Sequence, residues 1–147
     1  MTRVTFAYFD SSALIKRYVS ERGSGRVVSL LRRHDLLSSA ITPVEILSAL
    51  SRRRRERELS IEDFTTTVRR IQSERAGWEL IEVGATVLDR AELVVQGALP
   101  MRALDAIHVA SLLFFQAATD SRVPFITADI RQRDSAVALG IEVISID

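Results

Sequence analysis

Apolar residues along the chain recur with two spacings, one typical of strands and the other of helices. The run Arg3–Phe9 is mostly apolar and predicts a buried strand. The spacing then changes to that of a helix over Ser11–Tyr18, which would turn Ala13, Leu14 and Tyr18 inward. The first segment is therefore predicted to be a strand followed directly by a short helix.

The remaining segments continue this alternation. Strands are predicted at "WELIEV" and "VPFIT", and the chain after "VPFIT" has the pattern of a helix, a glycine and a final strand. The short apolar stretch "LLSSAIT" lies between two helices. The predicted helices cover about residues 24–33, Thr42 through Leu50 into an arginine run, the segment after Ser60 with Ile61, Phe64, Val68 and Ile71 on one face, and about residues 85–96 and 102–117.

Strands that alternate with helices are typical of a mainly parallel sheet with helices on both faces. The chain has 147 residues, of which 47% are hydrophobic, so we expect one α/β domain over residues 1–147. In such folds ligands bind outside the carboxyl ends of the strands. We therefore expect the functional residues to lie at that edge of the sheet.

The composition argues against cysteine-based sites, a membrane span and a signal peptide. Cysteine is absent, which excludes disulfides and thiolate metal ligands, so a bound metal would be held mainly by oxygen. The most apolar run, residues 103–118, is interrupted by polar residues, and we expect no membrane span. Asp10 and Lys16 interrupt the N-terminal region where a signal peptide would be apolar. A cytoplasmic protein is therefore expected.

The charge of the whole chain is nearly balanced, at +1, but arginine is concentrated in "RRRRERE", residues 52–58. Arginine binds phosphate well, so the run could guide a nucleic acid. It could equally be a solvated helix face with Glu56 and Glu58 as partners.

Four carboxylates occupy unusual positions. Asp10 follows the first strand and Asp129 follows "VPFIT", so both should lie at the carboxyl edge of the sheet. Glu45 and Asp105 are flanked by apolar residues near helix starts. Each has a structural alternative: Asp10 and Asp129 as helix N-caps, Glu45 as part of a capping box with Thr42, and Asp105 as an acid favoured by the helix dipole.

Taken together, the four acids suggest one shared site. Carboxylates brought close to one another raise each other's pKa values or bind a cation. A set of carboxylate oxygens suits a hard cation such as Mg²⁺ or Mn²⁺.

Four segments in order, "YFDSSALIKRYVSERGS", "ITPVEILSAL", "MRALDAIHVASLL" and "FITADIRQRDSAVALGIEVI", resemble the motifs of PIN-domain ribonucleases, in particular VapC-type toxins. The resemblance spans nearly the whole chain. It implies a three-layer α/β/α domain in which Asp10, Glu45, Asp105 and Asp129 hold one or two Mg²⁺ or Mn²⁺ ions, and it implies endonucleolytic cleavage of RNA. It also implies a homodimer and a cognate antitoxin protein as partner.

The resemblance extends to neighbouring side chains. Hydroxyls beside the acids would be those of Ser11 or Ser12 and of Thr127. A departure from the family pattern is the charged pair Arg133 and Asp134 after the fourth motif, which leaves open whether Asp134 reaches the metal.

Other polar residues near the motifs have two interpretations each. His108 would share a helix face with Asp105 and could be a general acid, or it could be a packed histidine bonded to the backbone. Lys16 and Arg17 could contact phosphate or simply be exposed. For dimer or antitoxin contacts we expect the faces carrying Ile61, Phe64, Val68 and Ile71, or Val87, Leu88, Ala91 and Val94.

The sequence has two alternatives to an RNA-cleaving enzyme. Haloacid-dehalogenase-like phosphatases also place Asp after the first strand, but they need a second Asp where this chain has Ser12. A non-catalytic metal- or phosphate-binding module that acts through a protein partner stays open, because ligands can be intact where turnover is lost.

Overall fold

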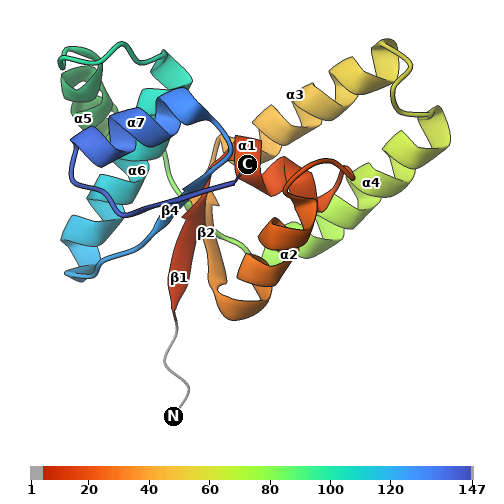
Figure 1. Cartoon of the computed structure of the whole chain (residues 1–147), viewed down its shortest axis with the longest axis horizontal. Helices are drawn as coiled ribbons and strands as arrows, with labels where there is room; N and C mark the ends of the chain where they lie inside the picture. The colour runs from red at the N-terminus through yellow and green to blue at the C-terminus, as the bar shows by residue number, and fades with distance from the viewer. Residues whose placement is uncertain (1–4, 147) are drawn as a thin grey trace.

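Five short strands form one parallel sheet in the order β3-β2-β1-β4-β5. The computed structural model describes residues 5–146 of the chain (Figure 1). The predicted α/β fold with a mainly parallel sheet is confirmed. The strands are β1 (Phe6–Phe9), β2 (Asp35–Ser39), β3 (Glu79–Ile81), β4 (Phe125–Thr127) and β5 (Val143–Ser145).

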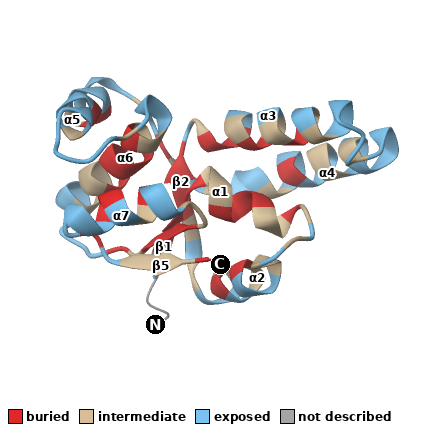
Figure 2. Cartoon of the chain, turned by 45° about the horizontal axis from the view of Figure 1, so that its top comes forward, coloured by how far each residue is buried: buried red, intermediate tan, exposed pale blue. Residues whose placement is uncertain are grey.

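Helices cover both faces of this sheet, as predicted for an α/β/α sandwich. Side chains alternate through β1, so that Ala7 and Phe9 join the core on one face and Tyr8 joins the core on the other. Residues of α1 to α4 pack into the first core, and residues of α5 to α7 into the second (Figure 2). The helices are α1 (Ser11–Leu14), the 3₁₀ turn η1 (Ile15–Arg17), α2 (Ser24–Arg33), α3 (Thr42–Arg55), α4 (Ile61–Glu74), the 3₁₀ turn η2 (Arg75–Gly77), α5 (Ala85–Val95), α6 (Ala103–Thr119) and α7 (Ile130–Ala138).

The strand β2 lies where sequence analysis found only an apolar stretch. Two serines in "LLSSAIT" interrupt the apolar pattern, yet Ser38 and Ser39 are fully buried. The Ser38 hydroxyl donates to the Phe9 carbonyl at 2.6 Å and lies 2.6 Å from the Thr42 hydroxyl. A buried serine with such bonds fits a central strand as well as an apolar residue does.

The N-terminal segment agrees with most of its prediction. The helix expected over Ser11–Tyr18 is α1 continued by η1, and Ala13, Leu14 and Tyr18 are buried as expected. The strand begins at Phe6, while Arg3 and Val4 of the predicted strand lie outside the described residues.

The helices α3 and α4 form a hairpin that extends away from the sheet (Figures 1 and 2). Its inner side packs on the core through Ile46, Leu50 and Ile71. Ile61, predicted on the same inner face of α4, is instead 67% exposed near the tip. Within residues 5–146, no helix has the length and apolar character needed to cross a membrane.

Candidate active site

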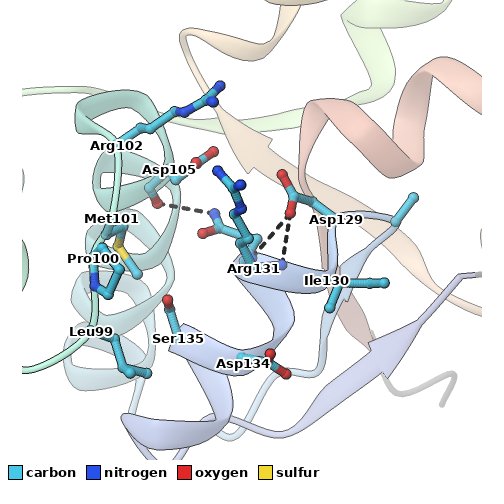
Figure 3. Close-up of a pocket in the computed structure, with 12 residues that line it drawn as sticks. Leu99, Pro100, Met101, Arg102, Asp105, Asp129, Ile130, Arg131, Asp134 and Ser135 are labelled. Atoms are coloured by element: carbon cyan, nitrogen blue, oxygen red, sulfur yellow. Dashed lines mark hydrogen bonds between the residues drawn. The ribbon is translucent and has the colours of Figure 1, made fainter.

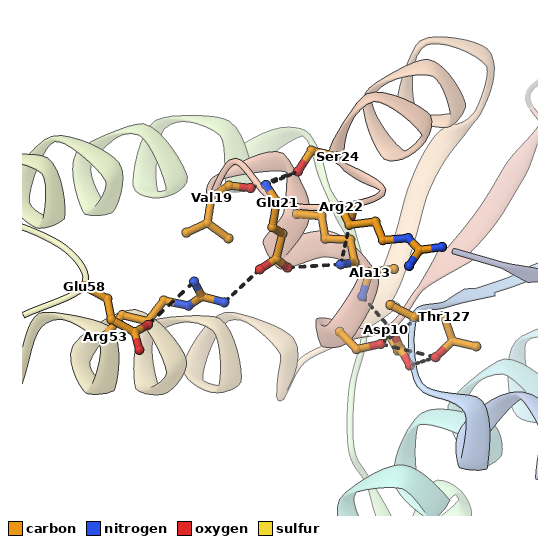
Figure 4. A network of polar contacts seen from close by, with 12 residues as sticks. Asp10, Ala13, Val19, Glu21, Arg22, Ser24, Arg53, Glu58 and Thr127 are labelled. Carbon is orange, nitrogen blue, oxygen red and sulfur yellow. Dashed lines mark hydrogen bonds and ion pairs between the residues drawn. The ribbon is translucent and has the colours of Figure 1, made fainter. Parts of the chain in front are cut away.

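Asp10 lies at the junction of β1 and α1 and is only 4% exposed. Its Oδ1 accepts the backbone N–H of Ala13 at 3.0 Å, so the N-cap interpretation is geometrically right. Oδ1 also accepts the Ser12 hydroxyl and Oδ2 accepts the Thr127 hydroxyl, both at 2.6 Å (Figure 4). Burial raises the pKa of Asp10, and the hydroxyl hydrogen bonds from Ser12 and Thr127 oppose that rise.

The two hydroxyls connect the ends of β1 and β4. Ser12 Oγ accepts the N–H of Ala128 at 3.0 Å, and Thr127 Oγ1 accepts the N–H of Asp129 at 3.1 Å. Each hydroxyl thus donates to Asp10 and accepts from the segment that carries Asp129. Of the two serines considered from sequence, Ser12 is the one that bonds to Asp10.

Glu45, in the first turn of α3, bonds to a side chain rather than to its own helix start. Its Oε1 lies 2.6 Å from Nε2 of His108. The capping box predicted for Thr42 and Glu45 is therefore wrong: the N-cap is Ile41, without a side-chain cap. The reason is that Thr42 bonds to Ser38, and Glu45 turns toward α6.

His108 lies between two partners from other elements. It is 1% exposed, and its Nδ1 lies 2.8 Å from the hydroxyl of Tyr8, which is fully buried. Burial raises the pKa of Tyr8 well above its ordinary value, so its hydroxyl stays protonated beside Nδ1, while Nε2 faces Glu45. His108 is packed, as one interpretation expected, but its ring bonds to side chains and not to the backbone.

Asp105, in the first turn of α6, is half-buried. Burial raises its pKa, and the charge of Asp129 raises it further; His108 opposes this rise, and Asp10 and Glu45 add smaller increases. The four predicted acids therefore lie near enough to influence one electrostatic site. Among the described residues, no hydrogen bond or ion pair engages the Asp105 carboxylate.

Asp129 is the N-cap of α7 and faces the same region. Its Oδ1 accepts the N–H groups of Arg131 at 2.9 Å and Gln132 at 3.3 Å (Figure 3). The N-cap alternative is thus correct for this oxygen. Asp105 and Asp129 both line a cavity of about 860 Å³ between the start of α6 and α7.

Gln132 links these two acids and is 2% exposed. Its backbone N–H bonds to Asp129, and its side-chain Nε2 donates to the Asp105 carbonyl at 3.0 Å. The other amide atom, Oε1, is buried and has no hydrogen-bond partner among the described residues. Gln132 therefore fixes the distance between α6 and α7 at the cost of one unsatisfied acceptor.

Four carboxylates are suitable ligands for a hard cation. In this structure, however, Asp10, Glu45 and Asp129 are hydrogen-bonded to other groups of the protein, and the Asp105 carboxylate has no such bond among the described residues. Within residues 5–146, no three Asp, Glu or His side chains are arranged to hold one metal ion. Asp134 is 60% exposed at its side chain and pairs with Arg133 at 3.0 Å, although it also lines the cavity.

Several basic residues considered from sequence have structural partners. Lys16 donates to Glu21 at 3.1 Å, and Arg17 donates to Glu74 at 2.9 Å. In the arginine run, Arg53 pairs with Glu21 at 2.9 Å, and with Glu58 at 4.0 Å. Lys16 and Arg17 are thus not simply exposed, as one interpretation expected, because they form ion pairs within the fold, and Arg53 has a structural partner outside the run.

Comparison with known protein families shows which family this chain belongs to. The PIN domain model matches residues 7–138. The chain belongs to the PIN domain family. The resemblance noted from the four sequence segments is thereby confirmed.

Individual relatives agree with this assignment. The PIN domain is 32% identical over 107 residues to Ribonuclease VapC45 of Mycobacterium tuberculosis, covering 72% of this chain and 74% of that protein. The fold matches FitAcB from Neisseria gonorrhoeae with a TM-score of 0.71 and 16% identity, over 95% of this chain and 96% of that one. It also matches VapBC2 from Rickettsia felis, bound to a promoter DNA fragment, with a TM-score of 0.66 and 11% identity over 97% and 100% of the two chains.

Sequence reasoning missed two residues of the site, Tyr8 and Gln132. A signal existed for Tyr8, because a tyrosine in the apolar strand "FAYF" needs a partner for its hydroxyl. Gln132 stands between two arginines and has the sequence context of a surface residue. Only the packing of α7 against α6 buries it.

Proposed function

We propose that this PIN domain is a metal-dependent endoribonuclease in which Asp10, Glu45, Asp105 and Asp129 hold Mg²⁺ or Mn²⁺. The observation that carries the proposal is that the Asp105 carboxylate lies near three other acids whose charges raise its pKa. Burial raises its pKa, and the charges of Asp129, Asp10 and Glu45 raise it further against the opposing effect of His108. A divalent cation at this point relieves the repulsion among all four.

The chemistry of the donors fits this cation, since all four candidate ligands are carboxylates and the chain has no cysteine. When bound, the ion supplies a Lewis acid that activates water and neutralises charge on the reacting phosphate. The name of the relative VapC45, a ribonuclease, supports RNA as the substrate.

The surrounding residues hold the acids for this task. Ser12 and Thr127 donate to Asp10 and favour its ionised form despite burial. Nε2 of His108 lies 2.6 Å from Glu45 Oε1, and this contact keeps that carboxylate oriented. Asp105 is the acid with no competing donor among the described residues, so it is available to a cation at once.

The test is cleavage of an end-labelled single-stranded RNA in EDTA, in Mg²⁺ and in Mn²⁺. We expect internal cuts that require either metal and that disappear in Asp10→Asn, Glu45→Gln, Asp105→Asn and Asp129→Asn. The matched control is Asp89→Asn, an exposed aspartate on α5, which should cut like the wild type. Cleavage that persists in EDTA, or in all four variants, would rule out this site.

We also infer that the chain acts as the toxin of a toxin–antitoxin pair and forms a homodimer. Solved structures with this fold support the antitoxin, since one is described as a toxin–antitoxin complex from Klebsiella pneumoniae, with a TM-score of 0.61 and 17% identity. Both contact faces expected from sequence are only partly available to a partner, because Ile71, Val87 and Ala91 are buried in this chain's own core. Ile61 and Leu88 stay exposed.

These partners are tested separately from cleavage. Light scattering at tens of micromolar should give twice the mass of the 16.4 kDa chain. A small protein encoded beside this chain should co-purify with it and suppress RNA cleavage. A monomer would contradict the dimer, and a neighbour that fails to bind would contradict the antitoxin.

A further inference from the structure

The cavity beside Asp105 and Asp129 is larger than the proposed cleavage chemistry requires. Its volume is about 860 Å³, within the range of roughly 300–1,000 Å³ typical of sites for small organic ligands. The two acids occupy one end of it (Figure 3). The other residues that line it, on the loop before α6 and on α7, have no part in holding a cation.

Two arginines line the cavity near the acids. Arg102 is the residue before α6, and Arg131 is in the first turn of α7. Both are exposed, and in the described part of the chain neither lies within ion-pair distance of a carboxylate. Figure 3 shows their guanidinium groups at the same end of the cavity as the carboxylates of Asp105 and Asp129.

Away from these acids and arginines, one wall of the cavity is apolar, while Asp134 and Ser135 of α7 also line the cavity. Leu99, Pro100 and Met101, from the loop between α5 and α6, line the apolar wall (Figure 3). Leu99 is 41% exposed, so part of its side chain is accessible from the cavity. Cations beside an apolar wall are the combination that a nucleotide needs, because its phosphate is anionic and its base has apolar faces.

We propose that this cavity binds one nucleotide of single-stranded RNA next to the phosphate that is cut. Arg102 and Arg131 hold a backbone phosphate that the acids alone would repel, and the base packs on Leu99, Pro100 and Met101. The strand must be single because a base can enter such a cavity only when it is unpaired and unstacked. This inference rests on the proposed ribonuclease function and names where its substrate binds.

The loop contains a convenient reporter for the base. The chain has two methionines, Met1 and Met101. Protein labelled with ¹³C at the methionine methyl groups gives two signals, and Met101→Leu identifies the one in the cavity. The titration is done in EDTA with 5′-nucleoside monophosphates, and ribose 5-phosphate is the ligand that has the phosphate without the base.

We expect at least one nucleoside monophosphate to shift the Met101 signal saturably, and ribose 5-phosphate to shift it much less. Arg102→Gln and Arg131→Gln should each weaken this binding by at least about threefold, since each removes a charge-assisted contact. Arg122→Gln is the matched control and should not change it. Arg122 is also exposed, but it follows the other end of α6, about 25 Å along the helix axis from Arg102.

Three results would overturn the subsite. The Met101 signal could stay fixed with all four nucleotides, it could shift equally with ribose 5-phosphate, or it could respond only to protein concentration because a second copy covers the cavity. The titration needs neither metal nor turnover. Cleavage in Mg²⁺ with an unresponsive Met101 therefore removes the subsite alone, and a responsive Met101 without cleavage removes the ribonuclease proposal alone.

Discussion

Two groups of carboxylates in this PIN domain have opposite electrostatic surroundings. Glu21 and Glu74, beside α1, α3 and α4, are bonded to lysine and arginine, and their pKa values are lowered. Asp10 and Asp105, at the carboxyl edge of the sheet, have raised pKa values and no ion pair to a lysine or arginine in the described part of the chain. The same chemical group thus serves two purposes.

Glu74 is at the centre of the first group. Burial alone would raise its pKa, but the side chains around it outweigh that effect. Arg17 donates from Nε at 2.9 Å and from Nη2 at 3.2 Å, Tyr18 donates at 2.8 Å, and Arg70 donates at 3.2 Å. This network joins the end of α4 to the segment after α1.

Glu21 joins α3 to the same segment. It accepts Lys16 at 3.1 Å and Arg53 at 2.9 Å (Figure 4). These bonds lower its pKa against the opposing effect of burial. Around the α3–α4 hairpin, carboxylates therefore stabilise the fold by pairing with cations.

The difference is not caused by a lack of cations at the sheet edge. Arg102 and Arg131 line the same cavity as Asp105 and Asp129, yet they form no ion pair with them. The mutual repulsion of the acids raises the pKa of Asp105, and under the proposed function a bound cation relieves it. Residues that break local rules in this way are expected at functional sites.

The largest effect that follows concerns Asp105→Asn, which keeps the shape of the side chain and removes its charge. RNA cleavage in Mg²⁺ should fall by more than about 100-fold, because even outer partners of a metal are worth roughly 10- to 100-fold. In EDTA the free energy of unfolding should stay equal or rise, because repulsion is relieved. Urea unfolding and a cleavage assay measure both.

Metal provides the control for Asp105→Asn. Millimolar Mg²⁺ should raise the melting temperature of the wild type more than that of the variant, because binding to the native state adds RT ln(1 + [L]/Kd). A variant that melts lower in EDTA, gains equally from Mg²⁺ and still cuts RNA would remove Asp105 from the site.

The opposite result is expected for Glu74→Ala in the paired group. This change leaves Arg17 and the Tyr18 hydroxyl without their acceptor and should lower the free energy of unfolding by about 2 kcal/mol, the worth of hydrogen bonds to a charged group. Cleavage at a temperature where the variant is folded should not change. Glu92→Ala, an exposed site on α5, is the control and should cost less than about 0.5 kcal/mol. A large loss of cleavage in folded Glu74→Ala would contradict the division between the two groups.

A smaller effect on cleavage is expected for Gln132→Leu. The leucine removes the bond to the Asp105 carbonyl and also the buried Oε1 that has no partner among the described residues. A lost hydrogen bond costs about 1 kcal/mol and an unsatisfied buried acceptor about 1–3 kcal/mol, so stability should change little or improve. Cleavage should fall about tenfold, since Asp105 and Asp129 lose their link. Unchanged cleavage would reduce Gln132 to a packing residue.

Much of the fold could be predicted because its elements follow simple periodic patterns. The helices α2, α5 and α6 begin and end within two residues of their expected bounds, and β4 lies inside the predicted "VPFIT". The strand β2 could not be predicted in this way. Its serines are acceptable inside the sheet only because partners from β1 and α3 are close, and such partners do not appear in a local pattern.

The four-acid site stays a prediction, and the hydrogen bonds around its acids could not be predicted from the sequence. Asp10 and Asp129 follow strands, so the rule for parallel sheets was enough to find them. The partner of Glu45 is His108, 63 positions away, and the second partner of that histidine is Tyr8, 100 positions away. Contacts at such separations are set by the packing of α3, α6 and β1 together.

The two groups should also respond oppositely to pH. A carboxyl with a raised native pKa makes the free energy of unfolding fall as pH rises from the ordinary value of 3.8 through the raised value, because the native state holds the proton longer. Glu21 and Glu74, with lowered pKa values, lose their stabilising effect only as pH falls below the ordinary value of 4.5. Above that pH, the stabilising effect of Glu21 and Glu74 is constant, so among these four acids only Asp10 and Asp105 should make the free energy of unfolding change with pH.

This response is measured by urea unfolding in EDTA at pH values of about 4.5 and 7. The stability of the wild type relative to Asp105→Asn should be lower at the higher pH. Added Mg²⁺ should remove or reverse this difference, since the cation favours the ionised carboxylates. An equal relative stability at both pH values would mean that the pKa of Asp105 is not raised.

The smallest effect concerns arginines at the tip of the α3–α4 hairpin. Arg53 is bonded to Glu21, and the Arg54 guanidinium lies 5.0 Å from the centre of the Phe64 ring, so these two are occupied. Arg52 and Arg55 are exposed, about 10 to 15 Å along the α3 axis from Glu45, and could still guide RNA. If both meet phosphates, the double variant Arg52→Gln, Arg55→Gln should flatten the dependence of log affinity on log salt by about 1.4, or 0.7 for each contact. The control double variant, Arg32→Gln with Arg33→Gln at the end of α2, should keep the slope. An unchanged slope in the first pair would make the run a solvated helix face, and the charge that attracts RNA would then have to come from the cavity arginines beside the acids.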